Sequence, residues 1–172
     1  MTWIVMVFVL LCAAVIQALL PGCAFLGHAK FPLLLMVVLY YALNREVYVM
    51  LIAGFMAGFI HDSFSLMPLG YSSACFCIIG FVAGCFRKLI MADSFIAPVF
   101  FGALAGVLAT IGFYALLAMG SFIVSSAGLV VMKTIGTGIL GMVCAPIVFY
   151  VIGRFDRLVG NVYVGESIDG VE

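Results

Sequence analysis

Charge is scarce in this sequence of 172 residues, which has seven Lys or Arg, seven Asp or Glu and two His. Charged residues make up 8% of the chain and hydrophobic residues 67%. An average soluble domain has about 25% charged and roughly 45–50% apolar residues, so this chain cannot cover a surface that faces water. With a net charge of zero and no cluster of basic residues, the sequence also excludes a nucleic-acid-binding protein.

Metal-binding and cofactor-binding motifs are also missing. Cys75 and Cys77 stand two residues apart, but no second pair and no neighbouring His completes a tetrahedral site. Residues two apart on a helix point in different directions, which weakens the pair further. No phosphate loop, dinucleotide fingerprint or zinc-protease motif occurs. We therefore expect no metal and no cofactor.

Long apolar runs are what the sequence has instead. A membrane-spanning helix needs about 20 apolar residues, and six such runs fit within the chain. Their expected bounds are 3–20, 31–43, 46–62, 70–86, 95–119 and 127–153. The sequence predicts an all-α polytopic membrane protein, with six transmembrane helices in a compact bundle over residues 1–153 and a short cytoplasmic tail over residues 154–172.

The second and third runs are short for a span. The second can be lengthened by starting its helix near Cys23, and Pro32 would then kink this helix or else begin it. The third reaches full length only if its helix continues through His61 and Asp62 to about Ser65. The basic residues give the orientation, because they accumulate on the cytoplasmic side of membrane proteins. Both termini are then cytoplasmic, and Lys30 is the exception among the loops. The basic residues placed inside are Arg45, Arg87, Lys88, Arg154 and Arg157.

Pairs of glycines four residues apart mark three of the expected helices. Small residues allow helix backbones to approach closely in lipid, where no hydrophobic effect drives helices together. Two interpretations stay open: these faces pack inside one bundle, or at least one of them docks a helix of another protein. The pairs are Gly54 and Gly58, Gly80 and Gly84, and Gly102 and Gly106.

Ionisable residues inside a membrane segment are candidates for function. Lys133 is the clearest case, and it either extends its ammonium to the outer interface or pairs with an acid such as Asp62. Catalysis lacks support from the sequence. His61 and Asp62 are consecutive, so on a helix their side chains diverge by about 100°, and no nucleophile motif accompanies them. We expect no enzyme activity.

The segment "AGFMAGFIHDSFSLMPLGYSSACFCIIGFVAG", residues 53–84, carries a spaced set of residues. A glycine-rich helix runs into Asp62, and a short turn ends in Pro68, Leu69 and Gly70. This set resembles the rod shape-determining protein MreD family. It departs from the family pattern at His61, where an apolar residue is expected, and in the bulky stretch 64–67.

The chemistry of the turn agrees with this pattern. Pro68 fixes its φ angle and Gly70 tolerates angles that other residues avoid, so together they favour a tight outer turn. We expect Asp62 to accept hydrogen bonds from amides of the turn and to hold the turn against the preceding helix. A direct role of Asp62 in gripping a partner or a ligand is the alternative.

The resemblance implies a non-enzymatic scaffold in the bacterial inner membrane. Proteins of this family look like subunits of the cell-elongation machinery that bind the membrane helix of MreC. They thereby support RodA and penicillin-binding protein 2 in peptidoglycan synthesis above MreB filaments. Besides the lipid bilayer and these partners, a second copy of the chain stays open as a partner.

The resemblance also implies a bundle similar to the substrate-binding S-component of energy-coupling-factor transporters. The alternative function is therefore a membrane subunit that binds a vitamin-like small molecule. In that case, the outer loops around Asp62 and residues 120–126 would line the ligand cavity.

Overall fold

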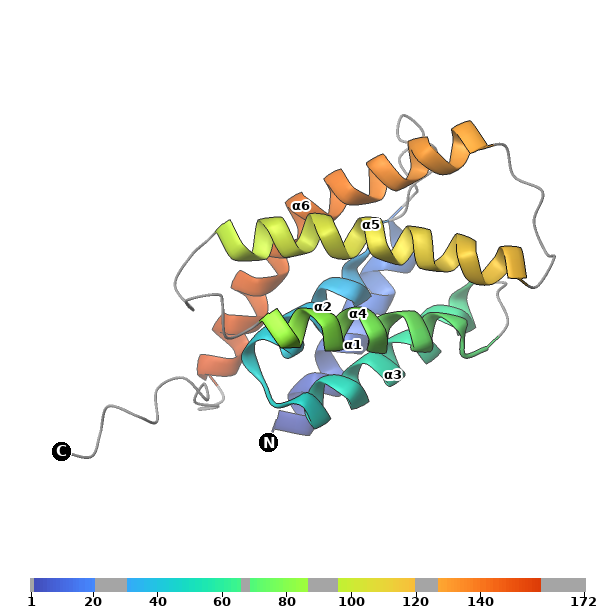
Figure 1. Cartoon of the computed structure of the whole chain (residues 1–172). Coiled ribbons are helices and arrows are strands. Elements are labelled where there is room, and N and C mark those ends of the chain that lie inside the picture. Colours follow the sequence, from blue (N-terminus) through green and yellow to red (C-terminus); the bar gives the residue numbers. More distant parts are fainter. Residues whose placement is uncertain (1, 21–30, 66–68, 87–95, 120–126, 159–172) are drawn as a thin grey trace.

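The computed structural model of the protein describes residues 2–20, 31–65, 69–86, 96–119 and 127–158. Within these ranges the chain is helical, without a strand. Helices that follow one another in the chain alternate in direction (Figure 1). The helices are α1 (Thr2–Leu19), α2 (Leu33–Asn44), α3 (Val47–Phe64), α4 (Tyr71–Cys85), α5 (Ile96–Met119) and α6 (Ala127–Leu158).

The helix lengths agree only in part with the prediction of six spans. Among the described helices, α3, α5 and α6 are long and apolar enough to cross a membrane, and α1, α2 and α4 are shorter apolar helices. At 1.5 Å per residue, the 12 residues of α2 extend about 18 Å, against roughly 30 Å of hydrocarbon. Helix α3 continues through Asp62 to Phe64, as the sequence predicted. Helix α2 begins at Leu33, directly after Pro32, and most of the extension considered from Cys23 lies outside the described residues.

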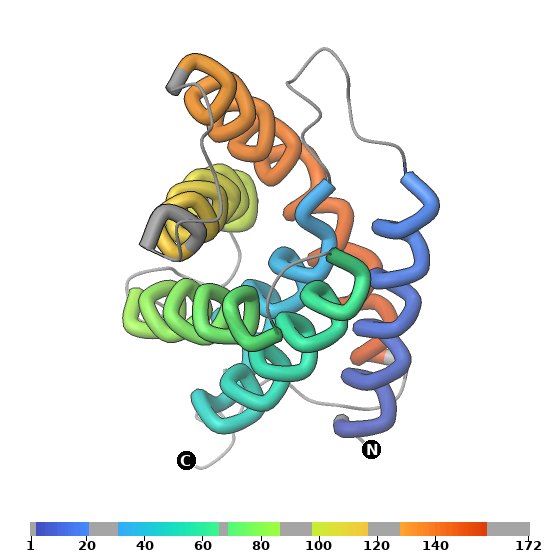
Figure 2. Tube along the Cα trace, turned by 90° about the vertical axis from the view of Figure 1, so that its right-hand side faces the viewer, coloured from blue at the N-terminus to red at the C-terminus, as the bar shows by residue number. Residues whose placement is uncertain are grey.

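Helix α2 forms the centre of the molecule. All its residues from Leu34 to Ala42 are buried, and the other helices pack around it (Figure 2). Its face towards each neighbour is apolar, so the core is one continuous hydrophobic cluster built on α2. This explains why the helix has no amphipathic pattern: a helix that is hydrophobic all round is a buried one.

Two helices receive their N-terminal hydrogen-bond acceptors from a neighbour. The residues before α2 and α4 are Pro32 and Gly70, which give no side-chain cap. The first amides of a helix lack partners within the helix, and an acceptor from another helix supplies them here. Gln17 of α1 accepts from the Leu34 amide at 3.1 Å, and Asp62 of α3 does the same for α4.

Helix α6 is the longest element, with 32 residues. It extends past residue 153, where the sequence predicted the start of a tail, to Leu158. Pro146 lies within it and lacks the N–H that an α-helix needs at that position. The helix bends, and its final part crosses towards α2 (Figure 1).

Candidate functional site

The turn between α3 and α4 is built on one buried carboxylate. Asp62 is 2% exposed. Its Oδ2 accepts a hydrogen bond of 2.7 Å from the Gly70 amide, and the Ser72 amide donates to Oδ1 and Oδ2 at 3.2 and 3.3 Å. These are amides of the N-terminus of α4, where a negative charge is favoured by the helix dipole. Asp62 therefore caps α4 from α3 and joins the two helices.

Gly70 takes a conformation that only glycine adopts readily, with φ at +103°. Leu69 beside it is 65% exposed, and Pro68 lies outside the described residues. The contacts expected for Asp62 and Gly70 are thus present in the structure. Whether this turn also grips a partner or a ligand stays a prediction.

His61 lies next to this carboxylate and contacts the hydroxyl of Ser72, the residue whose amide bonds to Asp62. Its Nδ1 is 2.9 Å from the Ser72 hydroxyl. The imidazole stacks on Phe113 of α5, with ring centroids 5.5 Å apart and planes 5° apart, and meets Phe76 of α4 edge-on. The unusual His61 therefore connects the end of α3 to α4 and α5, a role that its sequence neighbours did not indicate.

Removing the Asp62 carboxylate should destabilise the protein. In an Asp62→Ala variant the buried Ser72 amide loses its acceptor and the Gly70 amide loses its own, and an unsatisfied buried group costs about 1–3 kcal/mol. Asp62→Asn keeps one oxygen acceptor, so we expect a smaller loss. The measurement is unfolding of the purified protein by SDS in mixed micelles, followed by circular dichroism. Ser63→Ala is the matched control, because the Ser63 hydroxyl is exposed and, among the described residues, bonds to the Phe59 carbonyl alone. An Asp62→Ala variant as stable as this control would contradict the capping role.

The glycines of α3 and α4 pack inside the chain. A β-carbon added to Gly58 would overlap the backbone of Ser73. One on Gly54 would come within 3.2 Å of the Cys77 sulfur, and one on Gly80 within 2.8 Å of the Met50 sulfur. These contacts place the backbones of α3 and α4 close together, as expected for small-residue faces in lipid.

The glycines of α5 pack in the same way against α6. A β-carbon on Gly102 would lie 2.6 Å from the Gly141 carbonyl oxygen, and one on Gly106 would lie 2.6 Å from that of Thr137. The hydroxyls of Thr110 and Thr137 share a hydrogen bond across the seam. Of the six predicted glycines, Gly84 has the most room, with the Ala42 carbonyl oxygen 3.6 Å from an added β-carbon. Neighbours within the chain therefore contact all six.

Lys133 lies near the start of α6, where its ammonium is 5.9 Å from the centre of the Tyr114 ring. That distance suits a cation–π contact. Among the described residues, Asp62 does not pair with it: the ion pair that the structure shows involves other residues. Asp62 instead accepts from backbone amides.

That ion pair lies at the opposite end of the bundle, and the sequence did not indicate it. Arg45 Nη2 donates to Asp156 Oδ2 at 3.0 Å, and the Tyr40 hydroxyl donates to the same oxygen at 3.0 Å. Asp156 is fully buried and Arg45 is 8% exposed. Tyr40 also meets Phe149 edge-on, with centroids 5.3 Å apart. The end of α6 is thereby fixed to the end of α2 and the α2–α3 turn.

The helices, their apolar surfaces and the glycine seams between them define an all-helical membrane protein. Its family follows from comparison with known proteins. The family model of the rod shape-determining protein MreD matches residues 1–158. The chain belongs to the MreD family, a family of shape-determining membrane proteins, so the resemblance seen around Asp62 is confirmed. No curated protein and no solved structure matches the chain.

Proposed function

We propose that this chain is a non-enzymatic scaffold of the bacterial cell-elongation machinery in the inner membrane, and that it binds the membrane helix of an MreC-like protein. The match to the MreD family over residues 1–158 carries this proposal. RodA, penicillin-binding protein 2 and MreB are then indirect partners. The mechanism is helix packing, in which the bundle presents a docking surface to the partner helix.

The orientation belongs to the same proposal. The start of α1, the α2–α3 turn and the end of α6 lie at one end of the bundle (Figure 1). Arg45 is at this end, as are Arg154 and Arg157, which are exposed. Because positive charge accumulates on the cytoplasmic side, we assign this end to the cytoplasm and the α3–α4 turn to the periplasmic side.

The packing of the glycines changes where a partner helix should be sought. The faces of Gly54, Gly58, Gly102 and Gly106 are filled by neighbours within the chain. A leucine at Gly58 would disturb the fold before it could report on a partner. The partner must instead contact side chains that the bundle exposes, which occur on each of α1, α3, α4, α5 and α6.

Photo-crosslinking from single exposed positions tests the proposal. A tagged full-length chain would carry a photoreactive amino acid at one position per helix and be irradiated in its native membrane. The positions are Phe8, Phe55, Ile78, Leu104 and Ile139, each of which is exposed. We expect a single-span periplasmic protein to crosslink from one or two adjacent helices only, and the same protein to co-purify from mildly solubilised membranes.

Three outcomes would contradict the scaffold. The first is recovery of the chain without any protein partner from cells that contain the elongation machinery. The second is recovery with ATPase subunits and a bound small molecule, which would support the transporter subunit instead. Equal crosslinking from all five positions would indicate collision in the membrane, and this also counts against a docking face.

A further inference from the structure

Helix α6 divides into two arms that are held by different parts of the molecule. Pro146 separates a first arm, residues 127–145, from a second arm, residues 147–158. At the proline, the hydrogen bond to the Met142 carbonyl is lost, because its nitrogen carries no hydrogen. The two arms run in different directions (Figures 1 and 2). A proline of this kind is the usual origin of a sharp helix bend.

The first arm is locked to α5. Gly102 and Gly106 lie against the backbones of Gly141 and Thr137 without space for a methyl group. The Thr137 hydroxyl also lies 3.4 Å from the Gly106 carbonyl oxygen. Such close backbone contact allows little sliding, since a packed interior does not deform continuously. Helix α5 and the first arm therefore form one rigid unit, called here the α5–α6 pair.

The second arm is locked to a different part of the chain. Asp156 is held by Arg45 and Tyr40, and Phe149 packs on the ring of Tyr40. Ile152, one turn before Asp156, is 2% exposed. This arm therefore belongs to the body formed with α2 and the start of α3. The tight α3–α4 seam adds α4 to the same body.

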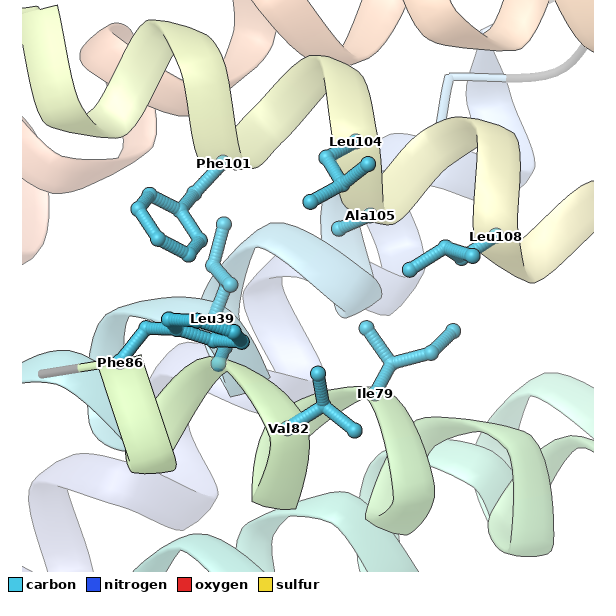
Figure 3. Close-up of a pocket in the computed structure, with 9 residues that line it drawn as sticks. Leu39, Ile79, Val82, Phe86, Phe101, Leu104, Ala105 and Leu108 are labelled. Carbon is cyan, nitrogen blue, oxygen red and sulfur yellow. The ribbon is translucent and has the colours of Figure 1, made fainter.

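The α5–α6 pair meets this body across a different kind of seam. Between α4 and α5 lies an apolar crevice, with Leu39 of α2 at its floor (Figure 3). Phe86 and Phe101, whose ring centroids are 6.5 Å apart, belong to its lining. Further along the same two helices, the ring centroids of Phe76 and Phe113 are 6.0 Å apart. The remaining side chains that line the crevice are Ile79, Val82, Ala83, Leu104, Ala105 and Leu108.

The two kinds of seam differ in how they respond to movement. Most of the side chains that line the crevice, such as Leu39, Leu104 and Leu108, can change rotamer, whereas the α5–α6 seam has backbone against backbone. Val82 and Leu104, on opposite sides of the crevice, are each 40% exposed. In a membrane, lipid chains can fill the space between these side chains as the crevice widens, since the hydrocarbon is as apolar as the side chains themselves.

We propose that the α5–α6 pair swings as one body about Pro146, and that this motion opens and closes the α4–α5 crevice. This is a hinge of the kind in which a few residues absorb the change between two rigid bodies. The second arm of α6 stays fixed by Asp156. The crevice is then the part of the lipid-facing surface of the protein whose width changes. The helix–helix spacing at the α3–α4 and α5–α6 seams stays constant.

Pulsed EPR distances in lipid nanodiscs test the hinge. Spin labels on unnatural amino acids avoid the native cysteines, and they are placed on exposed residues of α3, α4, α5 and α6: Phe55, Ile78, Ile111 and Ile135. The pair Phe55 and Ile111 spans the hinge. The pairs Phe55 and Ile78, and Ile111 and Ile135, each lie within one body and serve as controls for folding and label motion.

We expect a broad or two-peaked distance distribution across the hinge and narrow ones for both controls. A Pro146→Ala change restores the backbone hydrogen bond and should collapse the broad distribution into one narrow peak, with the controls unchanged. A distribution across the hinge as narrow as the controls would overturn the proposal. So would a breadth that Pro146→Ala leaves unaltered, because the motion would then not depend on the proline.

Discussion

A Gly58→Ala variant is expected to lose much of its stability, whereas a Gly84→Ala variant should keep all of it. The two residues are both helical glycines of predicted packing pairs, and they differ in what a methyl group would meet. At Gly58 it would overlap the Ser73 backbone, which cannot rotate away. At Gly84 the nearest atom, the Ala42 carbonyl oxygen, lies at an ordinary contact distance of 3.6 Å.

Overpacking of this kind costs about 1–3 kcal/mol and more where the backbone must move. An alanine at Gly84 should instead stabilise its helix by up to about 0.5–1 kcal/mol, through its greater helix propensity. The measurement is SDS-induced unfolding in mixed micelles by circular dichroism. Equal stability of the two variants would mean that α3 and α4 are not closely packed at Gly58.

An Asp156→Ala variant is expected to lose about 3–5 kcal/mol of stability, because it leaves the Arg45 charge buried without its carboxylate. Tyr40 would lose the acceptor of its hydroxyl in the same change. Arg157→Ala is the matched control, one residue further along the same helix end and exposed. Exposed surface changes of that kind usually stay within about 0.5 kcal/mol.

A double variant separates the ion pair from packing. Arg45→Met with Asp156→Leu replaces both charges by apolar side chains of similar size, and such exchanges are often neutral or stabilising. We therefore expect it to be more stable than Asp156→Ala alone, when both are unfolded under the same conditions. If the double variant is the less stable of the two, the buried charge is not the cause of the loss.

The α3–α4 turn could be predicted from the sequence because its information is local. Asp62, Pro68 and Gly70 lie within a few residues of each other, and short segments with a carboxylate, a proline and a glycine have few ways to satisfy their amides. What the sequence did not give is the identity of the donors: Asp62 bonds to the first amides of the next helix. The contact of His61 with Phe113 depends on a helix far along the chain, so it was not foreseen.

The ion pair of Arg45 and Asp156 shows the opposite case. The two residues lie 111 positions apart, and each has an ordinary local explanation: a basic turn and a charged helix end. One signal was available in the spacing of Val148, Ile152 and Asp156, which places the acid on the same helix face as two apolar residues. A carboxylate that continues an inward face needs a buried partner. Arg45, Arg87 and Lys88 were all predicted on the same side, so the sequence alone did not single out Arg45.

The count of six spans could be predicted only in part, because apolar length does not distinguish a helix that crosses lipid from one that is enclosed by protein. Helix α2 is apolar for the second reason. The glycine pairs were ambiguous in the same way, since a small-residue face fits a helix of the same chain or of another. Three-dimensional packing resolved that choice for Gly58, Gly102 and Gly106 by showing what fills their space.

The enclosed position of α2 has a consequence for how the protein is made. Helix α2 leaves the ribosome second, but four of the helices that cover it, α3 to α6, are synthesised after it. With 12 residues it is well short of the roughly 20 needed to hold a stable position across a bilayer alone. Its burial is complete only once α6, which packs against it and carries Asp156, has been synthesised. The burial of an early helix is thus completed by the last helix to be synthesised.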